Sequence, residues 1–92
     1  MLGVSVQQIE NEVNTLIGLS QDDLREVYKN EIGRSYPRNA RGSGIIYKII
    51  HHRLGTDFTR KDIGNDKKLE EHFRVDEEIK KLIRSKRGVY GR

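Results

Sequence analysis

The chain has 92 residues, of which 34% are hydrophobic and 35% charged, with a net charge of +4 and no cysteine. A chain of this length forms one small domain, so we expect residues 1–92 to fold as a single unit. The lack of cysteine excludes disulfides and thiolate metal sites. No apolar run reaches the roughly 18 residues of a membrane span, and the N-terminal residues do not resemble a signal peptide, so we expect a cytoplasmic protein.

Two helices are predicted in the first third of the chain. The first spans Val6 to Ile17, where apolar residues recur at helical spacing, with Ser5 as N-cap and Gly18 as a left-handed end. The second follows the N-cap Ser20 and ends at Gly33. Two aspartates in its first turn favour the positive end of the helix dipole.

A basic loop and an apolar helix are predicted next. Pro37 disfavours helical conformation in the residue before it, so the second helix cannot run on. We expect the third helix to begin near Ser43, with Asn39 or Ser43 as its N-cap, and to end at Gly55. Its four isoleucines recur as i, i+4 pairs, which indicates a helix. Their branched side chains lower helix propensity and leave a strand as the alternative.

The remaining residues have a less regular pattern. Residues 56–65 have no clear period, and we expect Phe58 and Ile63 to anchor them to the core. Residues 66–87 predict a helix, but the apolar positions on the two sides of Asp76 are out of phase, which favours two helices or one kinked helix. Residues 85–92 are expected to form a flexible basic tail. The sequence therefore predicts an all-α fold of four to five helices.

The chain shows no motif for catalysis. His51 and His52 are adjacent and would point about 100° apart on a helix, so they cannot ligate one metal as an i, i+4 pair would. No HExxH motif and no phosphate-binding glycine loop of the nucleotide-binding kind is present. We therefore expect a protein that is not an enzyme and has neither a cofactor nor a metal site.

The most distinctive stretch runs from Gly33 to Leu54, which contains five bases and no acid. Helix N-termini favour anions, and arginine binds phosphate well. The alternative is a solvated helix face joined to an ordinary turn. A basic tail would add nonspecific attraction to a polyanion. The residues predicted to contact nucleic acid, DNA more than RNA, are Arg34, Tyr36, Arg38, Asn39, Arg41, Lys48, Arg53, Lys86 and Arg87.

Residues 19–54 resemble the helix–extended loop–helix unit of SAP-type DNA-binding domains. The resemblance rests on a capped helix, an extended loop and an apolar helix ending in Arg53–Leu54, although the loop here is longer and richer in arginine. The first half of the chain is also similar to a family of small phage-related bacterial proteins of uncharacterised function, which implies a mobile-element origin. The matching positions are Leu19, Leu24, Tyr28, Gly33, Arg34, Pro37, Arg38, Asn39 and Arg53–Leu54.

A second function remains open from the sequence. A phage or mobile-element protein can bind a host protein and inhibit or modulate it, and a basic helical surface would suit an acidic groove on such a partner. The apolar stripe of the first helix would equally serve as the seam of a homodimer. Neither alternative involves a membrane.

Overall fold

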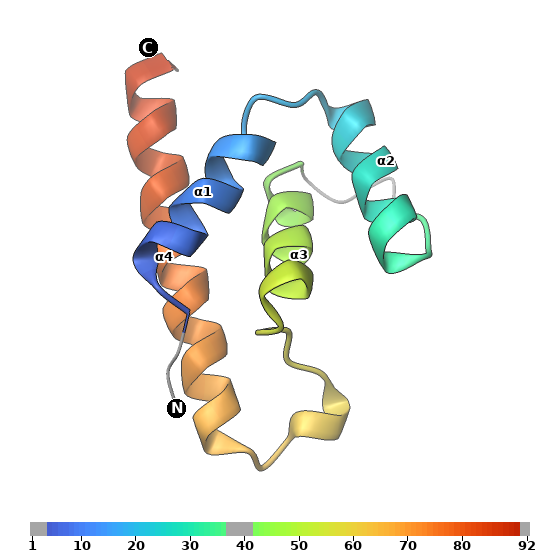
Figure 1. The fold of residues 1–92 in the computed structure, drawn as a ribbon, viewed down its shortest axis with the longest axis vertical. Coiled ribbons are helices and arrows are strands. Elements are labelled where there is room, and N and C mark those ends of the chain that lie inside the picture. The colour runs from blue at the N-terminus through green and yellow to red at the C-terminus, as the bar shows by residue number, and fades with distance from the viewer. Residues whose placement is uncertain (1–3, 37–41, 91–92) are drawn as a thin grey trace.

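The computed structural model describes residues 4–36 and 42–90, and the regular elements in this part of the chain are all helical. The predicted all-α fold is therefore confirmed. None of the described helices is long and apolar enough to cross a membrane. In chain order the elements are α1 (Val6–Leu16), α2 (Gln21–Ile32), α3 (Gly42–Leu54), the short 3-10 helix η1 (Arg60–Asp62) and α4 (Asp66–Tyr90), shown in Figure 1.

The first two helices have the N-caps that the sequence predicts. The Ser5 hydroxyl accepts the N–H of Gln8, whose side chain accepts the N–H of Ser5 in return. Ser20 caps α2, and Gly33 ends it in the left-handed conformation with φ of 90°. The predicted left-handed end at Gly18 is wrong. The chain stays right-handed at the end of α1, where backbone hydrogen bonds tighten the last turn without a positive φ.

The third helix ends as predicted but begins slightly earlier. Gly55 has a φ of 73° directly after α3, which suits a residue without a side chain. Because α3 starts at Gly42, Ser43 lies inside the first turn and is not the N-cap. The other predicted cap, Asn39, lies outside the described residues.

The last helix is a single helix of 25 residues, so of the two predicted alternatives two separate helices are wrong, and a kink near Asp76 stays a prediction. The buried stripe of α4 consists of Val75, Ile79 and Ile83, which follow each other at steps of four. This stripe, and not the exposed Phe73, sets the face that packs inward. The helix runs to Tyr90, a little beyond the expected end near Arg87, and the predicted mobility of the tail stays a prediction.

The core forms around α3, which contacts α1, α2 and α4. In Figure 1, α2 lies on one side of α3, while α1 and the long α4 lie on the other. All four isoleucines of α3 are buried, which explains why such a β-branched stretch is stable as a helix: packing outweighs propensity. The buried apolar residues are Ile9, Val13, Leu16, Leu24, Tyr28, Ile45, Ile46, Ile49, Ile50, Val75, Ile79 and Ile83.

The connection between α3 and α4 is held by polar contacts rather than by the predicted apolar anchors. Ile63 is 75% exposed, so its predicted anchoring role is wrong. The carboxylate of Asp62 instead accepts the N–H of Thr59 and pairs with Lys68 at 3.0 Å. Phe58 is half-buried, with its ring tilted against that of His72.

Candidate functional site

Tyr36 fixes the start of the basic loop between α2 and α3. Its ring meets Tyr28 edge-on, with centroids 4.9 Å apart. Its hydroxyl lies so near the first turn of α3 that a Cβ on Gly44 would be 2.6 Å away. Burial raises the pKa of Tyr36. The residue predicted to stack on bases is therefore held by packing, and the lack of a side chain at Gly44 permits this close approach.

Two open hollows lie on either side of Tyr36. The first, which we call the α2 groove, has a volume of about 370 Å³ and is lined by Asp22, Arg25, Glu26, Lys29, Ser35 and Tyr36. The second, which we call the histidine pocket, has a volume of about 290 Å³. It is lined by Tyr36, Gly44, Tyr47, Lys48, His51, Asp57, Phe58, His72 and Asp76.

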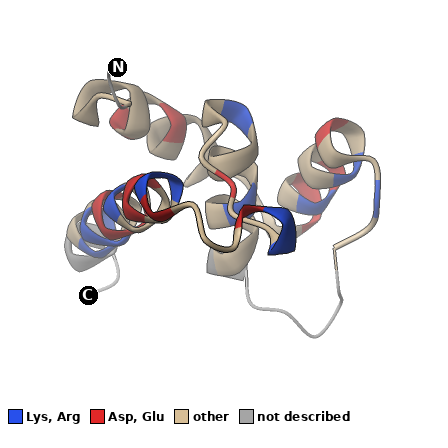
Figure 2. Ribbon diagram, turned by 90° about the horizontal axis from the view of Figure 1, so that it is seen from below, with Lys and Arg blue, Asp and Glu red and all other residues tan. Residues whose placement is uncertain are grey.

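Acidic and basic side chains alternate along the α2 groove. Asp22 and Glu26 are its acids and Arg25 and Lys29 its bases, and the exposed Arg34 follows α2 in the chain. On the other side of Tyr36, Lys48 is an exposed base on α3, a helix without a single carboxylate. Figure 2 shows both signs along α2 and along α4. We call Lys29, Arg34 and Lys48 the basic rim.

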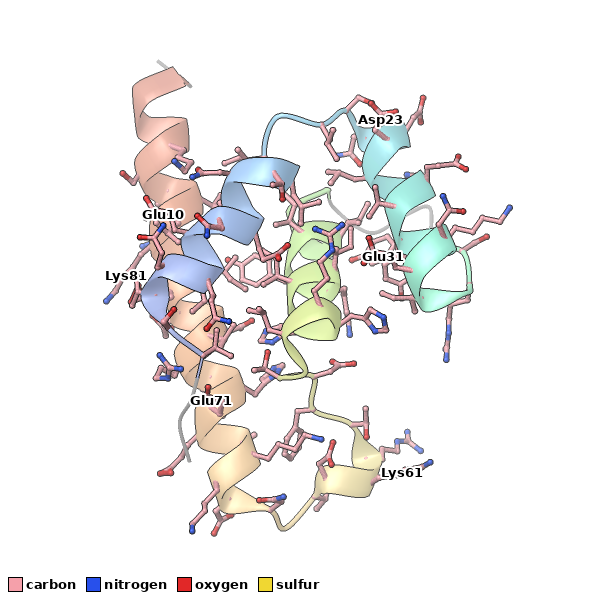
Figure 3. All side chains as sticks on the ribbon, in the orientation of Figure 1. Glu10, Asp23, Glu31, Lys61, Glu71 and Lys81 are labelled. Atoms are coloured by element: carbon pink, nitrogen blue, oxygen red, sulfur yellow. The ribbon has the colours of Figure 1, made fainter. Side chains whose placement is uncertain are left out.

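Arg53, the last base of the Gly33–Leu54 stretch, forms ion pairs with carboxylates of two other helices. Its guanidinium donates through Nε and Nη2 to both carboxylate oxygens of Glu31 on α2, and through Nη1 to Glu12 on α1 at 2.7 Å. Figure 3 shows Glu31 on the side of α2 that faces α3. The guanidinium lowers the pKa of Glu31. Arg53 therefore joins three helices, and we leave it out of the basic rim.

The other predicted contact residues are spread over different parts of the chain. Arg34 is exposed directly after α2, and Lys86 is half-buried near the end of α4. The loop residues Arg38, Asn39 and Arg41 lie outside the described residues, and so does the side chain of Arg87. Of the predicted contact residues, the described geometry thus brings together Tyr36 and Lys48, which line the same pocket, while Arg34 is exposed two residues before Tyr36.

A cluster of titratable side chains that sequence analysis missed lies in the histidine pocket. His51 is buried at the end of α3, and its Nε2 is 2.9 Å from Oδ1 of Asp76 on α4. The ring of His72 is stacked on that of His51, with centroids 4.1 Å apart and planes 20° apart. We call His51, His72 and Asp76 the histidine cluster. The signal available in the sequence was the i, i+4 spacing of His72 and Asp76, which places them on one helix face.

Thr56 holds both rings of the cluster. Its hydroxyl is 2.7 Å from Nδ1 of His51, and its carbonyl oxygen is 2.9 Å from Nδ1 of His72. Burial lowers the pKa of His51, although Asp76 acts in the opposite direction, so the ring is neutral at pH 7. A hydroxyl, an imidazole and a carboxylate in sequence resemble a nucleophile with its base. Because Thr56 is 4% exposed, however, a substrate cannot reach that hydroxyl.

Comparison with protein-family models, curated proteins and solved structures gives no significant match to this chain. The resemblances to SAP-type domains and to phage-related proteins therefore stay predictions.

Proposed function

We propose that this protein binds nucleic acid, with DNA as its preferred form, through phosphate contacts made by the basic rim and by the loop that follows Tyr36. The observation that carries the proposal is the placement of exposed bases on both sides of Tyr36. The preference for DNA rests on the resemblance of residues 19–54 to SAP-type units.

The arrangement of the rim suits a phosphate backbone. Lys29 lies on α2, Arg34 follows that helix and Lys48 lies on α3, so the three bases flank residues 37–41 in the sequence. That loop adds Arg38 and Arg41, which makes five bases within 20 residues of sequence. Phosphates are bound by such bases and by backbone N–H groups at helix N-termini, without base-specific contacts.

The other helices suit a polyanion less well. The bases of α4 include Arg74, which pairs with Glu71, and Lys81, which lies 3.8 Å from Glu78. Since an ion pair offsets the positive charge locally, these side chains present a mixed surface. The acidic α1 contributes no base at all. The surface proposed for phosphate is therefore the basic rim and not the whole of α2, which also carries four carboxylates.

The test is fluorescence anisotropy with labelled duplex DNA, single-stranded DNA and RNA at two salt concentrations. We expect micromolar or tighter binding that falls steeply as salt rises, because each phosphate contact releases counterions. The form that binds most tightly identifies the substrate class. Absence of binding at low salt would overturn the proposal, and a pull-down would then test the alternative, a host protein as the partner.

Matched charge variants locate the surface. In one variant the basic rim is neutralised by Lys29→Gln, Arg34→Gln and Lys48→Gln, and in a second the loop is neutralised by Arg38→Gln and Arg41→Gln. The control removes three exposed bases elsewhere, by Lys61→Gln, Lys67→Gln and Lys80→Gln. We expect the first two variants to weaken binding and to flatten its salt dependence, by about one unit of slope per lost contact. An equal loss in the control would show attraction by net charge alone.

A further inference from the structure

The histidine cluster offers the donor atoms that transition metals prefer. His72 and Asp76 project from the same face of α4, and His51 faces them from the last turn of α3. One donor atom from each of the three residues lies within 4.8 Å of the other two. Two imidazole nitrogens and one carboxylate oxygen form a ligand set found in zinc sites that keep a further position open.

The hydrogen bonds of Thr56 prepare both rings for such a role. A carbonyl oxygen only accepts, so Nδ1 of His72 carries a proton, and in the neutral form of an imidazole this leaves the lone pair on Nε2. The hydroxyl of Thr56 can either donate to Nδ1 of His51 or accept from it. Metal-bound histidines usually donate their second ring nitrogen to a group of this kind, which fixes the tautomer and the ring orientation.

We infer that His51, His72 and Asp76 bind a divalent transition-metal ion, with zinc as the best-matched example. The ion would take the place of the hydrogen bond between Nε2 of His51 and Asp76, and the ring proton of His51 would move to Nδ1, where the Thr56 hydroxyl accepts it. No net proton is released in this step. Ligands in a tetrahedral zinc site are roughly 3.3 Å apart, so the 2.9 Å contact has to widen by about 0.4 Å. The ring of His72 also has to rotate out of its stack on His51, so that a nitrogen now within 4.8 Å of the other donor atoms can point at the ion.

The surroundings of the cluster suit a doubly charged ion. Asp57 lines the same pocket and adds a second carboxylate, while the exposed Lys48 adds one positive charge to its lining. The pocket is open and leaves space for a water molecule as a further ligand. The side chain of Asp76 is 41% exposed and His72 is half-buried, so both can adjust while His51 stays fixed by burial.

The test uses the untagged full chain after removal of metal by a chelator. Isothermal titration calorimetry with Zn²⁺ should give one ion per chain, and Co²⁺ should give the visible absorption of a four-coordinate site. Zinc should also raise the Tm, because it binds the folded chain preferentially. A Kd weaker than about 1 mM, or no change in Tm, would overturn the inference and leave a purely structural hydrogen-bond network.

Two variants and one matched control assign the site. His72→Ala removes a ligand from a half-buried position, and Asp76→Asn removes the carboxylate charge. His52→Ala removes an exposed histidine that adjoins His51 and lies outside the cluster. Loss of a direct ligand should weaken zinc binding at least about 100-fold, since loss of an outer partner alone costs 10–100-fold. Zinc affinity that depends on His52, or that survives both cluster variants, would place the ion elsewhere. None of these readouts depends on nucleic-acid binding.

Discussion

The middle and the last turn of α3 differ in how their polar side chains are used. In the middle of the helix, Lys48 is exposed and lines the open histidine pocket. In the last turn, His51 and Arg53 are held by partners from other helices, through Asp76 on one side and Glu12 and Glu31 on the other. Lys48 and Arg53 look equivalent in the sequence, as bases on one apolar helix. The spatial neighbours of each base, and not its own chemistry, separate a candidate contact residue from a structural one.

The largest expected effect on stability concerns the buried apolar face of α3. Ile49→Ala removes a fully buried side chain at the centre of the core and should lower the free energy of unfolding by about 3 kcal/mol. Urea denaturation followed by circular dichroism measures this. A loss below about 1 kcal/mol would mean that α3 is not the centre of the core.

A smaller loss of stability is expected from a substitution of Arg53 in the last turn of α3. Arg53→Ala leaves Glu31 and Glu12 without their partner and should cost about 1–2 kcal/mol, more than a typical surface pair because the contact with Glu31 is bidentate. Lys48→Ala is the matched control and should change the free energy of unfolding by less than about 0.5 kcal/mol. Equal losses of stability in the two variants would mean that Arg53 is no more a structural residue than Lys48.

The buried histidine predicts a pH dependence with a definite sign. The pKa of His51 is lower in the folded chain than its ordinary value, with Asp76, His72 and Asp57 as the titratable groups around it. The resulting stability is fully present above a pH of about 6.5 and is lost as the pH falls through the folded pKa, because the unfolded chain takes up the proton more readily. Urea denaturation of metal-free protein across this range checks the sign. His52→Gln should leave the profile unchanged, and stability that rises on acidification would contradict the prediction.

The smallest expected effect is that of Lys48, in the middle of α3, on nucleic-acid binding. Lys48→Gln should weaken binding of the preferred nucleic acid slightly and reduce the slope of log affinity against log salt by about 1, while stability is unchanged. Arg53→Lys keeps the charge but loses the bidentate contact, so it should show the reverse pattern, with lower stability and an unchanged salt slope. Anisotropy at several salt concentrations measures both. A flattened slope in Arg53→Lys would assign Arg53 to the interface after all.

The local parts of the fold were predictable from the sequence because their causes are local. Ser20 and Gly33 bound α2 through hydrogen bonds and a left-handed turn within a few residues of each other. The spacing of the isoleucines in α3 predicted a helix with a buried face. The predictions failed where contacts between residues distant in the sequence determine the structure. Ile63 is apolar but exposed. α4 continues past Asp76 because packing against other helices determines which of its residues are buried.

The candidate sites divide in the same way. A basic loop can be recognised from the residue types alone, and Arg34 and Lys48 are exposed, as contact residues must be. The ion pairs of Arg53 reach residues 22 and 41 positions away, so no local pattern reveals them. The histidine cluster joins α3 to α4 across 25 positions, and only the spacing of His72 and Asp76 hinted at it.

The packing of α2 on α3 has a consequence for how the molecule opens. It is the most extensive contact between two helices in the described part of the chain, followed by that of α1 on α4. Separating α2 from α3 would also break the Glu31–Arg53 contact. The opening that breaks the least packing therefore separates α2 and α3 together from α1 and α4, so the amides of α2 and α3 should exchange hydrogen with solvent as one group.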